Sequence, residues 1–197
     1  YVQTHTDEAK SLGIDLIGGT GQRMEFLHQL LAAAEERQTR VLVDDALRRH
    51  DFEILPAGGQ HSRTRAMLKV EDGCRNFCTY CIIPFARGPV RSLPLEEAAR
   101  QTEQLARQGY REVVLTGIEI SSWGQDLPGE ESLIDLLEAV SAAAGAMRVR
   151  LGSLEPVIAT ADFARALGEM PKLCPQFHLA LQSGCDSVLR RMRRRYD

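Results

Sequence analysis

No apolar run in this chain of 197 residues approaches the ~20 residues that a membrane-spanning helix needs, and no secretory hydrophobic segment is present. The five cysteines are an odd number and form no pairable framework, which excludes a disulfide-stapled secreted domain and favours a reducing compartment. Internal repeats and low-complexity segments are also missing, apart from one arginine run near the C-terminus. We therefore expect a globular protein of the cytoplasm with no membrane partner.

The charge of the chain is nearly balanced but unevenly placed. There are 24 Lys and Arg residues against 27 Asp and Glu, a net charge of −3, whereas residues 190–197 hold five arginines and one aspartate. A basic segment on an acidic body suits a phosphate backbone, which releases counterions when basic groups neutralise it. A solvated helix face explains the same run at least as well. Arg87 and Arg91 would extend a phosphate-binding path.

Three of the cysteines, Cys74, Cys78 and Cys81, lie in one loop with the spacing C-x3-C-x2-C and a tyrosine before the last. A free thiol with a pKa of about 8.5 is largely protonated at neutral pH, so three neighbours ionise together only around a cation. The spacing is compatible with structural zinc, but zinc needs a fourth ligand, and Cys174 and His61 are the candidates. Three ligands leave one coordination position open, as catalytic metals do.

Strands and helices are predicted to alternate after residue 64. Ser132 and Thr160 are expected to cap two of the helices. Four β/α units in a row imply an α/β fold whose parallel sheet curls toward a barrel, with reactive residues beyond the carboxyl ends of the strands. The predicted strands cover residues 65–70, 112–115, 147–151 and 177–182, and the helices cover 94–109, 132–145, 160–170 and 186–192.

Loops that follow the predicted strands carry the polar and metal-binding residues. Because the carboxyl ends of parallel strands meet at one edge, these groups are expected to face one mouth. They are Cys74, Cys78 and Cys81 after the first strand, Thr116 and Gly117 after the second, Ser153 and Glu155 after the third, and Gln182 after the fourth.

The cysteine spacing resembles that of the radical S-adenosylmethionine (SAM) enzymes, in which C-x3-C-x-aromatic-C follows the first strand of a partial barrel. The branch of this superfamily that fits best is the MtaB type of methylthiotransferase, which acts on N6-threonylcarbamoyladenosine beside the tRNA anticodon. The resemblance is strong over residues 63–197 and weak over residues 1–31. Four stretches carry it: GCRNFCTYCIIPFARGPVRS from Gly73, LTGIEISSWG from Leu115, RVRLGSLEP from Arg148 and FHLALQSGCD from Phe177.

The resemblance implies a fold and two cofactors. The fold would be a radical SAM partial (β/α) barrel with its first four β/α units present, preceded by the end of a small α/β methylthiotransferase N-terminal domain. Cys74, Cys78 and Cys81 would hold three irons of a [4Fe-4S] cluster, whose fourth iron binds the amino and carboxylate groups of SAM. An electron from the cluster would cleave SAM to a 5′-deoxyadenosyl radical, so that the cofactor does the difficult chemistry.

Six residues are candidates for contacts with SAM. Glycine permits a close approach of the main chain, while hydroxyl, carboxylate and amide groups suit an ammonium or a ribose, and an aromatic ring suits adenine. Alone, each has a plainer explanation, such as an ordinary turn, a surface acid or a core aromatic, but their alignment at one mouth favours the functional interpretation. The candidates are Tyr80, Thr116, Gly117, Ser153, Glu155 and Gln182.

Two arginines and two cysteines keep open roles. Arg148 and Arg150 alternate with apolar residues, which puts cations on one side of a strand expected to be dry. Either the barrel lumen is polar and takes an anionic substrate, or both arginines pair with local acids or reach solvent past the helices. Cys174 and Cys185 are interpreted as packing or incidental residues.

Three segments are predicted along the chain. Residues 1–37 would form the C-terminal part of the N-terminal methylthiotransferase domain, residues 38–62 a linker in which 41–43 can form a strand, and residues 63–197 a truncated radical SAM core. The family's auxiliary [4Fe-4S] cluster, expected in the full-length protein, needs three further cysteines that are absent here. We therefore expect this fragment alone to be incomplete for full turnover.

The sequence thus predicts an enzyme that inserts a methylthio group at C2 of N6-threonylcarbamoyladenosine in tRNA by radical SAM chemistry. Its expected partners are the tRNA anticodon arm and a low-potential electron donor such as flavodoxin or ferredoxin. An isopentenyladenosine tRNA or ribosomal-protein methylthiotransferase is the alternative within the family. From another class, a zinc-stabilised RNA-binding module would use the three cysteines with His61 or Cys174 and the arginine run.

Overall fold

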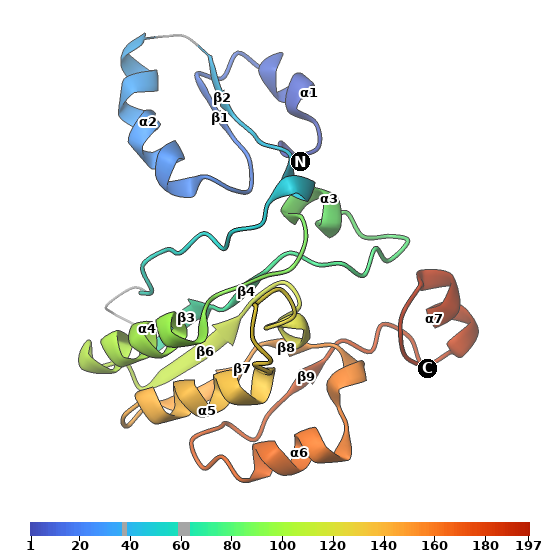
Figure 1. Cartoon of the computed structure of the whole chain (residues 1–197). Coiled ribbons are helices and arrows are strands. Elements are labelled where there is room, and N and C mark those ends of the chain that lie inside the picture. Colours follow the sequence, from blue (N-terminus) through green and yellow to red (C-terminus); the bar gives the residue numbers. More distant parts are fainter. Residues whose placement is uncertain (37–38, 59–63) are drawn as a thin grey trace.

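The computed structural model describes residues 1–36, 39–58 and 64–197. A small N-terminal part lies at one end, and the rest of the chain forms a body in which helices cover a parallel sheet (Figure 1). The predicted α/β class with parallel strands is confirmed. None of the helices in the described ranges has the length and apolar character of a membrane span.

The body is built on three parallel strands in the order β3-β6-β7. Their register places Leu68, Leu115 and Leu151 side by side on one buried face. That face packs against two helices that also contact each other, and together they form the main hydrophobic core. The strands are β3 (Arg65–Lys69), β6 (Glu112–Thr116) and β7 (Arg148–Leu151), and the helices are α4 (Leu95–Arg107) and α5 (Leu133–Ala143).

Capping side chains set the starts of two helices where the sequence predicted them. The Ser132 hydroxyl accepts a hydrogen bond from the N–H of Asp135, whose carboxylate in turn accepts from the Ser132 N–H, so α5 begins with a capping box. Thr160 caps α6 (Ala161–Gly168) by accepting from the N–H of Phe163. Both predicted caps are confirmed.

The fourth β/α unit is shorter than predicted. Two residues of the predicted strand 177–182 form β9 (His178–Leu179), which pairs in parallel with β8 (Ser153–Leu154) rather than with the main sheet. Pro156 begins the short helix η3 (Pro156–Ile158) and ends the partner strand early, while Gln182 takes a left-handed φ of 62°. Because β8 offers only two residues for pairing, β9 is also only two residues long. Helix α7 (Asp186–Met192) follows, as predicted.

Short elements that the sequence did not predict surround the cysteine loop. An antiparallel pair, β4 (Glu71–Asp72) and β5 (Arg91–Ser92), closes the base of the loop, and α3 (Ile83–Arg87) lies within it. Ser92 lies in β5, and its hydroxyl donates to the carboxylate of Asp126 at 2.6 Å. A further short helix, η2 (Ile120–Ser122), follows β6.

The N-terminal part contains α1 (Thr6–Lys10), β1 (Leu16–Gly18), α2 (Arg23–Glu36), β2 (Arg40–Leu42) and η1 (Ala46–Arg48). Strand β2 pairs in parallel with β1, so the start of the predicted linker 38–62 packs with this part of the molecule. His61 lies outside the described residues.

Asp72 joins the N-terminal part to the body. Four cations lie within 3.6 Å of its Oδ2, namely Arg23, Lys69, Arg87 and Arg91. Burial acts to raise the pKa of Asp72, but Lys69 and the arginines outweigh it and hold this pKa below its ordinary value. Arg91 is buried against Asp72, so the predicted phosphate path is wrong for this residue, whereas Arg87 pairs with the same carboxylate and stays partly exposed.

The contacts of Glu112 explain why β7 carries two arginines. Its carboxylate, only 5% exposed, pairs at 2.8 Å with each of Arg65, Arg148 and Arg150 at the end of the sheet opposite the cysteine loop. The hydrogen bond from Arg150 lowers the pKa of Glu112 below its ordinary value. Pairing with a local acid, rather than a lumen built for an anion, explains both arginines of β7.

Replacing Glu112 is expected to destabilise the sheet. Glu112→Gln keeps the shape but leaves three guanidinium groups without their counter-charge, so we expect the free energy of unfolding at pH 7 to fall by about 1–3 kcal/mol. Because the pKa of Glu112 is lowered by folding, this contribution is present above the unfolded pKa and disappears as the pH falls through the folded one. Urea unfolding at several pH values measures it.

The control for this prediction is Glu103→Gln, which removes an exposed pair with Arg107 on α4. Exposed pairs contribute roughly 0–1 kcal/mol. Equal losses of stability in the two variants would contradict the role given to Glu112.

Candidate cofactor site at the carboxyl ends of the strands

The cysteine loop leaves β4 through a tight turn and returns through β5. Gly73 has a φ of 96°, and a side chain there would collide with the main-chain oxygen of Pro89, so only glycine fits. The N–H of Cys74 donates to the oxygen of Gly88 at 3.0 Å, and the N–H of Cys81 donates to the oxygen of Cys78 at 2.9 Å. These bonds between main-chain groups fix the path of the loop that carries the three sulfur atoms.

A cavity of ≈ 210 Å³ opens beyond the strand ends and brings most of the predicted site together. Thr116 and Gly117 do not line it, and the second strand contributes Ile118 and Glu119 instead. The side chain of Arg194, which the sequence did not single out, also lines the cavity. The predicted residues among its lining are Cys74, Cys78, Tyr80, Cys81, Ser153, Glu155 and Gln182.

The donor set in this cavity fits an iron–sulfur cluster. Cys78 is buried and Cys74 and Cys81 are half-buried, and burial raises the pKa of Cys74 to about 11. Each of these three thiols can bind one iron of a [4Fe-4S] cluster, whose protein ligands are cysteine thiolates. Cys174 lies against Glu112, at the other end of the sheet.

Glu71 supports the cavity wall from behind. Its Oε2 accepts hydrogen bonds from the N–H groups of Ile118 at 2.8 Å and Glu119 at 2.7 Å. A Cβ on Gly117 would lie 2.7 Å from that oxygen, so glycine allows the wall to rest on the carboxylate. Burial raises the pKa of Glu71 to about 8, against the effect of the two N–H donors. The sequence analysis did not predict this role of Glu71, although an acidic residue directly after a predicted strand was a signal for it.

Glu155 links the cysteine loop to the end of the chain. One of its oxygens accepts from the side-chain amide of Asn76 at 3.1 Å, and the other pairs with Arg194 at 2.7 Å. The hydroxyl of Ser153 is hydrogen-bonded to Nδ1 of His178 at 2.7 Å, which ties β8 to β9 at the mouth. Tyr80 is 55% exposed at the rim. Asn76 and Arg194 were missed because neither has a recognisable spacing in the sequence.

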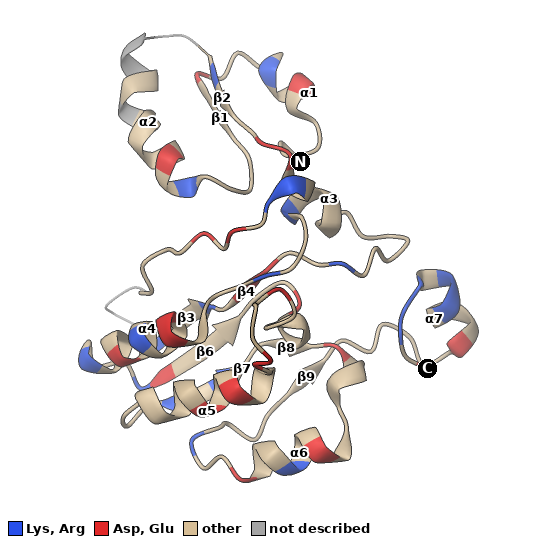
Figure 2. Ribbon diagram, in the orientation of Figure 1, with Lys and Arg blue, Asp and Glu red and all other residues tan. Residues whose placement is uncertain are grey.

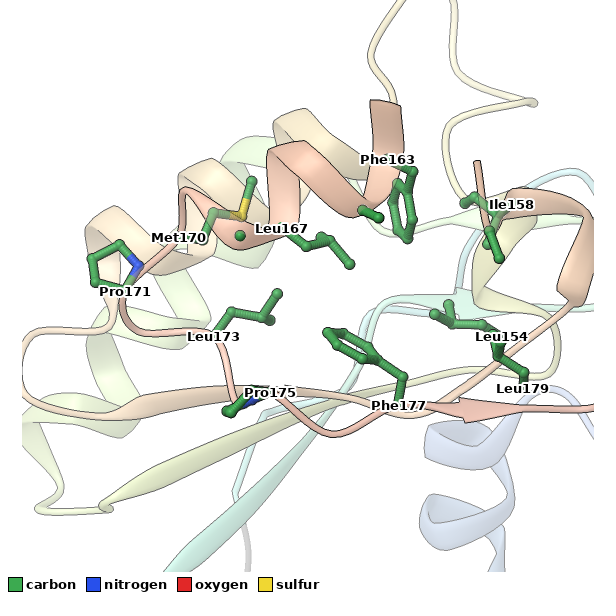
Figure 3. A pocket seen from close by; sticks show the side chains of 13 residues that line it. Leu154, Ile158, Phe163, Leu167, Met170, Pro171, Leu173, Pro175, Phe177 and Leu179 are labelled. Carbon is green, nitrogen blue, oxygen red and sulfur yellow. The ribbon is translucent and has the colours of Figure 1, made fainter. Parts of the chain in front are cut away.

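A second, larger cavity is mainly apolar. It has a volume of ≈ 480 Å³ and is lined by apolar side chains from α6 and the segment around β9, among them Phe163, Leu167, Leu173 and Phe177 (Figure 3). None of the described residues that line it carries an acid, base or thiol able to act in a reaction. The candidate site is the cysteine cavity, because the three cysteines and most of the predicted SAM contacts line it.

Comparison with known protein families agrees with this geometry. The family model described as the radical SAM superfamily matches residues 68–197. The chain belongs to this superfamily. The two cofactors predicted from the sequence, SAM and a [4Fe-4S] cluster, agree with this membership, whereas a zinc-stabilised RNA-binding module does not.

Curated relatives of this radical SAM chain are methylthiotransferases. Threonylcarbamoyladenosine tRNA methylthiotransferase MtaB of Bacillus subtilis is 38% identical over 197 residues, and the protein of that name from Thermotoga maritima is 36% identical over the same length. The tRNA-2-methylthio-N(6)-dimethylallyladenosine synthase of Clostridium tetani is 35% identical over 184 residues, 93% of this chain. The chain spans 44% of the two MtaB proteins and 40% of the synthase.

A solved structure shares the radical SAM fold. The radical S-adenosylmethionine methyltransferase TsrM from Kitasatospora setae superposes with a TM-score of 0.52 and 18% identity, over 62% of this chain and 23% of that one. At this identity the likeness concerns the fold alone.

The raised pKa of Glu71 predicts a pH dependence of stability in this radical SAM chain. Folding favours the neutral carboxyl, so its contribution is present below the unfolded pKa of about 4.5 and is lost as the pH rises through about 8. We expect the free energy of unfolding to fall more steeply between pH 5 and pH 8 in the parent than in Glu71→Gln, whose side chain stays neutral and can still accept both N–H bonds. Urea unfolding across this range measures the two slopes.

The exposed Glu130 provides the control, since Glu130→Gln is expected to keep the slope of the parent. Parallel curves for the parent and Glu71→Gln would show that this carboxyl does not titrate in the folded protein between those pH values.

Proposed function

We propose that this chain is the radical SAM core of a tRNA methylthiotransferase that inserts a methylthio group at C2 of N6-threonylcarbamoyladenosine. The observation that carries the proposal is the gathering of Cys74, Cys78 and Cys81 in one cavity with polar groups from three other strand ends. Identity of 38% over the whole chain to a protein named as an MtaB enzyme supports the choice of substrate. A cytoplasmic location follows from a tRNA substrate.

We assign the three cysteines as ligands of three irons of a [4Fe-4S] cluster. When bound, the cluster with SAM supplies the electron and the radical on which this chemistry depends. The loop would offer three thiolates to four irons, which leaves one iron with a coordination position for a small molecule. Burial of Cys78, and the cavity walls around it, limit the access of water to that position.

The polar lining of the cavity is assigned to SAM. The Glu155 carboxylate and the Ser153 hydroxyl would bind its ammonium or ribose from β8, Gln182 would act from beyond β9, and Tyr80 would cover the adenine at the rim. Thr116 and Gly117 would support this site through the main chain, because they connect β6 to the wall residues that rest on Glu71.

The radical SAM body offers a basic surface beside the mouth for the tRNA anticodon arm. Basic residues follow one another along α7 and the segment after it (Figure 2). Four of these arginines are exposed, Arg190, Arg191, Arg193 and Arg195, and Arg195 reaches the main-chain oxygen of Arg75 in the cysteine loop. Contacts to phosphates here would position the arm above the cavity. A low-potential donor such as flavodoxin or ferredoxin would supply the electron.

Anaerobic reconstitution with iron and sulfide tests the cluster. We expect the parent chain to bind both in equal amounts, to turn brown and to change its electron paramagnetic resonance signal when SAM is added. Cys74→Ala and Cys81→Ala are each expected to lose this signal, because three irons need three thiolates. Cys185→Ala serves as the control, since Cys185 is an exposed cysteine outside the loop. A colourless protein that binds zinc and ignores SAM would refute the assignment.

Nucleoside profiling of tRNA tests the substrate. A cell lacking the full-length gene is expected to lose 2-methylthio-N6-threonylcarbamoyladenosine, measured by mass spectrometry of digested tRNA. The gene should restore the peak, whereas the gene with the Cys81→Ala change should not. If the methylthio derivative of isopentenyladenosine disappears instead, the enzyme acts on that nucleoside.

A further inference from the structure

The segment after α7 folds back onto the cysteine loop. Helix α7 ends at Met192, the C-cap residue Arg193 takes a left-handed φ of 57°, and the chain then turns toward the cavity. The Thr79 N–H donates to the oxygen of Met192 at 3.3 Å, and the Tyr196 hydroxyl donates to the main-chain oxygens of Ala180 and Leu181 at 2.9 and 3.0 Å. The segment therefore connects the first β/α unit to the fourth.

This turn carries the Arg194 side chain into the cavity, where it is only 10% exposed. Its three guanidinium nitrogens have three different partners. Nη1 donates to Sγ of Cys78 at 3.1 Å, Nη2 pairs with Oε1 of Glu155 at 2.7 Å, and Nε donates to the hydroxyl of Tyr196 at 3.1 Å. The planar guanidinium holds its donors on three separate nitrogens in fixed directions, whereas the donors of a lysine all leave one nitrogen.

Arg194 also provides the counter-charge that Glu155 needs. The Glu155 side chain is 6% exposed, and a buried carboxylate is costly unless it is paired and hydrogen-bonded. Asn76 satisfies the other oxygen but brings no charge. The position of Glu155 in the cavity therefore depends on the guanidinium.

We propose that Arg194 is a positioning residue of the cluster site, which holds Glu155 toward the cavity and donates a hydrogen bond to the Cys78 sulfur when that sulfur is a cluster ligand. The inference rests on the proposed function, because it takes Cys78 as a ligand. Hydrogen bonds to ligand sulfurs and nearby positive charge favour the reduced cluster, which carries more negative charge. Arg194 would thus raise the reduction potential of the cluster.

Redox titration of the reconstituted protein, followed by electron paramagnetic resonance, tests the effect on the cluster. We expect Arg194→Gln to load as much iron as the parent and to show a more negative midpoint potential. Arg190→Gln is the matched control, because it removes one exposed arginine of α7 that lies outside the cavity. Equal potentials in a fully loaded Arg194→Gln and in Arg190→Gln would overturn the inference and leave the proposed function standing. A parent chain that assembles no cluster would overturn both.

A second measurement does not need the cluster, and it decides the matter if Arg194→Gln fails to load. Thermal unfolding of the protein without iron is compared for Arg194→Gln, Glu155→Gln and the double variant. If Arg194 holds Glu155, removing either partner leaves a buried group unpaired, so the double variant should lose less in melting temperature than the two single losses added together. Additive losses would contradict the positioning role.

Discussion

The parallel register of β3, β6 and β7 determines where a site can form in this molecule. Because these strands run in the same direction, their carboxyl ends lie at one edge, and the chain must leave the sheet there in three separate loops. β8 and β9, also parallel to each other, bring a fourth loop to the same edge. Residues more than 100 positions apart, such as Cys74 and Gln182, meet in one cavity for this reason.

Buried carboxylates hold these loops in place. Glu71 accepts hydrogen bonds from the main chain after β6. Asp72 pairs with cations from the N-terminal part and the cysteine loop, and Glu155 joins that loop to the segment after α7. Each is buried, and each carries hydrogen bonds or opposite charges that offset part of the cost of burial. At the far end of the sheet Glu112 does the same for three arginines. The sheet positions the loops, and the acids fix them.

The sequence predicted the features that depend on local pattern. Cysteine spacing, helix caps at Ser132 and Thr160, and the apolar strand around Val113 are each readable within a few residues. The features it did not predict depend on partners distant in the chain. No local pattern tells that Arg148 meets Glu112, that Arg91 turns inward to Asp72, or that Arg194 returns to Cys78 across 116 positions. The shortness of β9 has the same origin, since strand length is set by the neighbour available for pairing.

The charges in the cysteine cavity affect both the binding of metal by the thiols and the kind of ligand that the cavity favours. Burial raises the pKa of Cys74 to about 11, so this thiol holds its proton until a metal displaces it, and loading releases protons. Once ionised, three thiolates add negative charge to a cavity that already contains Glu119 and Glu155. Among the described residues that line it, Arg194 alone carries a fixed positive charge. Among the protein groups of the cavity, the anions outnumber the one guanidinium, which helps to balance the positive charge of bound iron and favours the sulfonium and ammonium groups of the ligand.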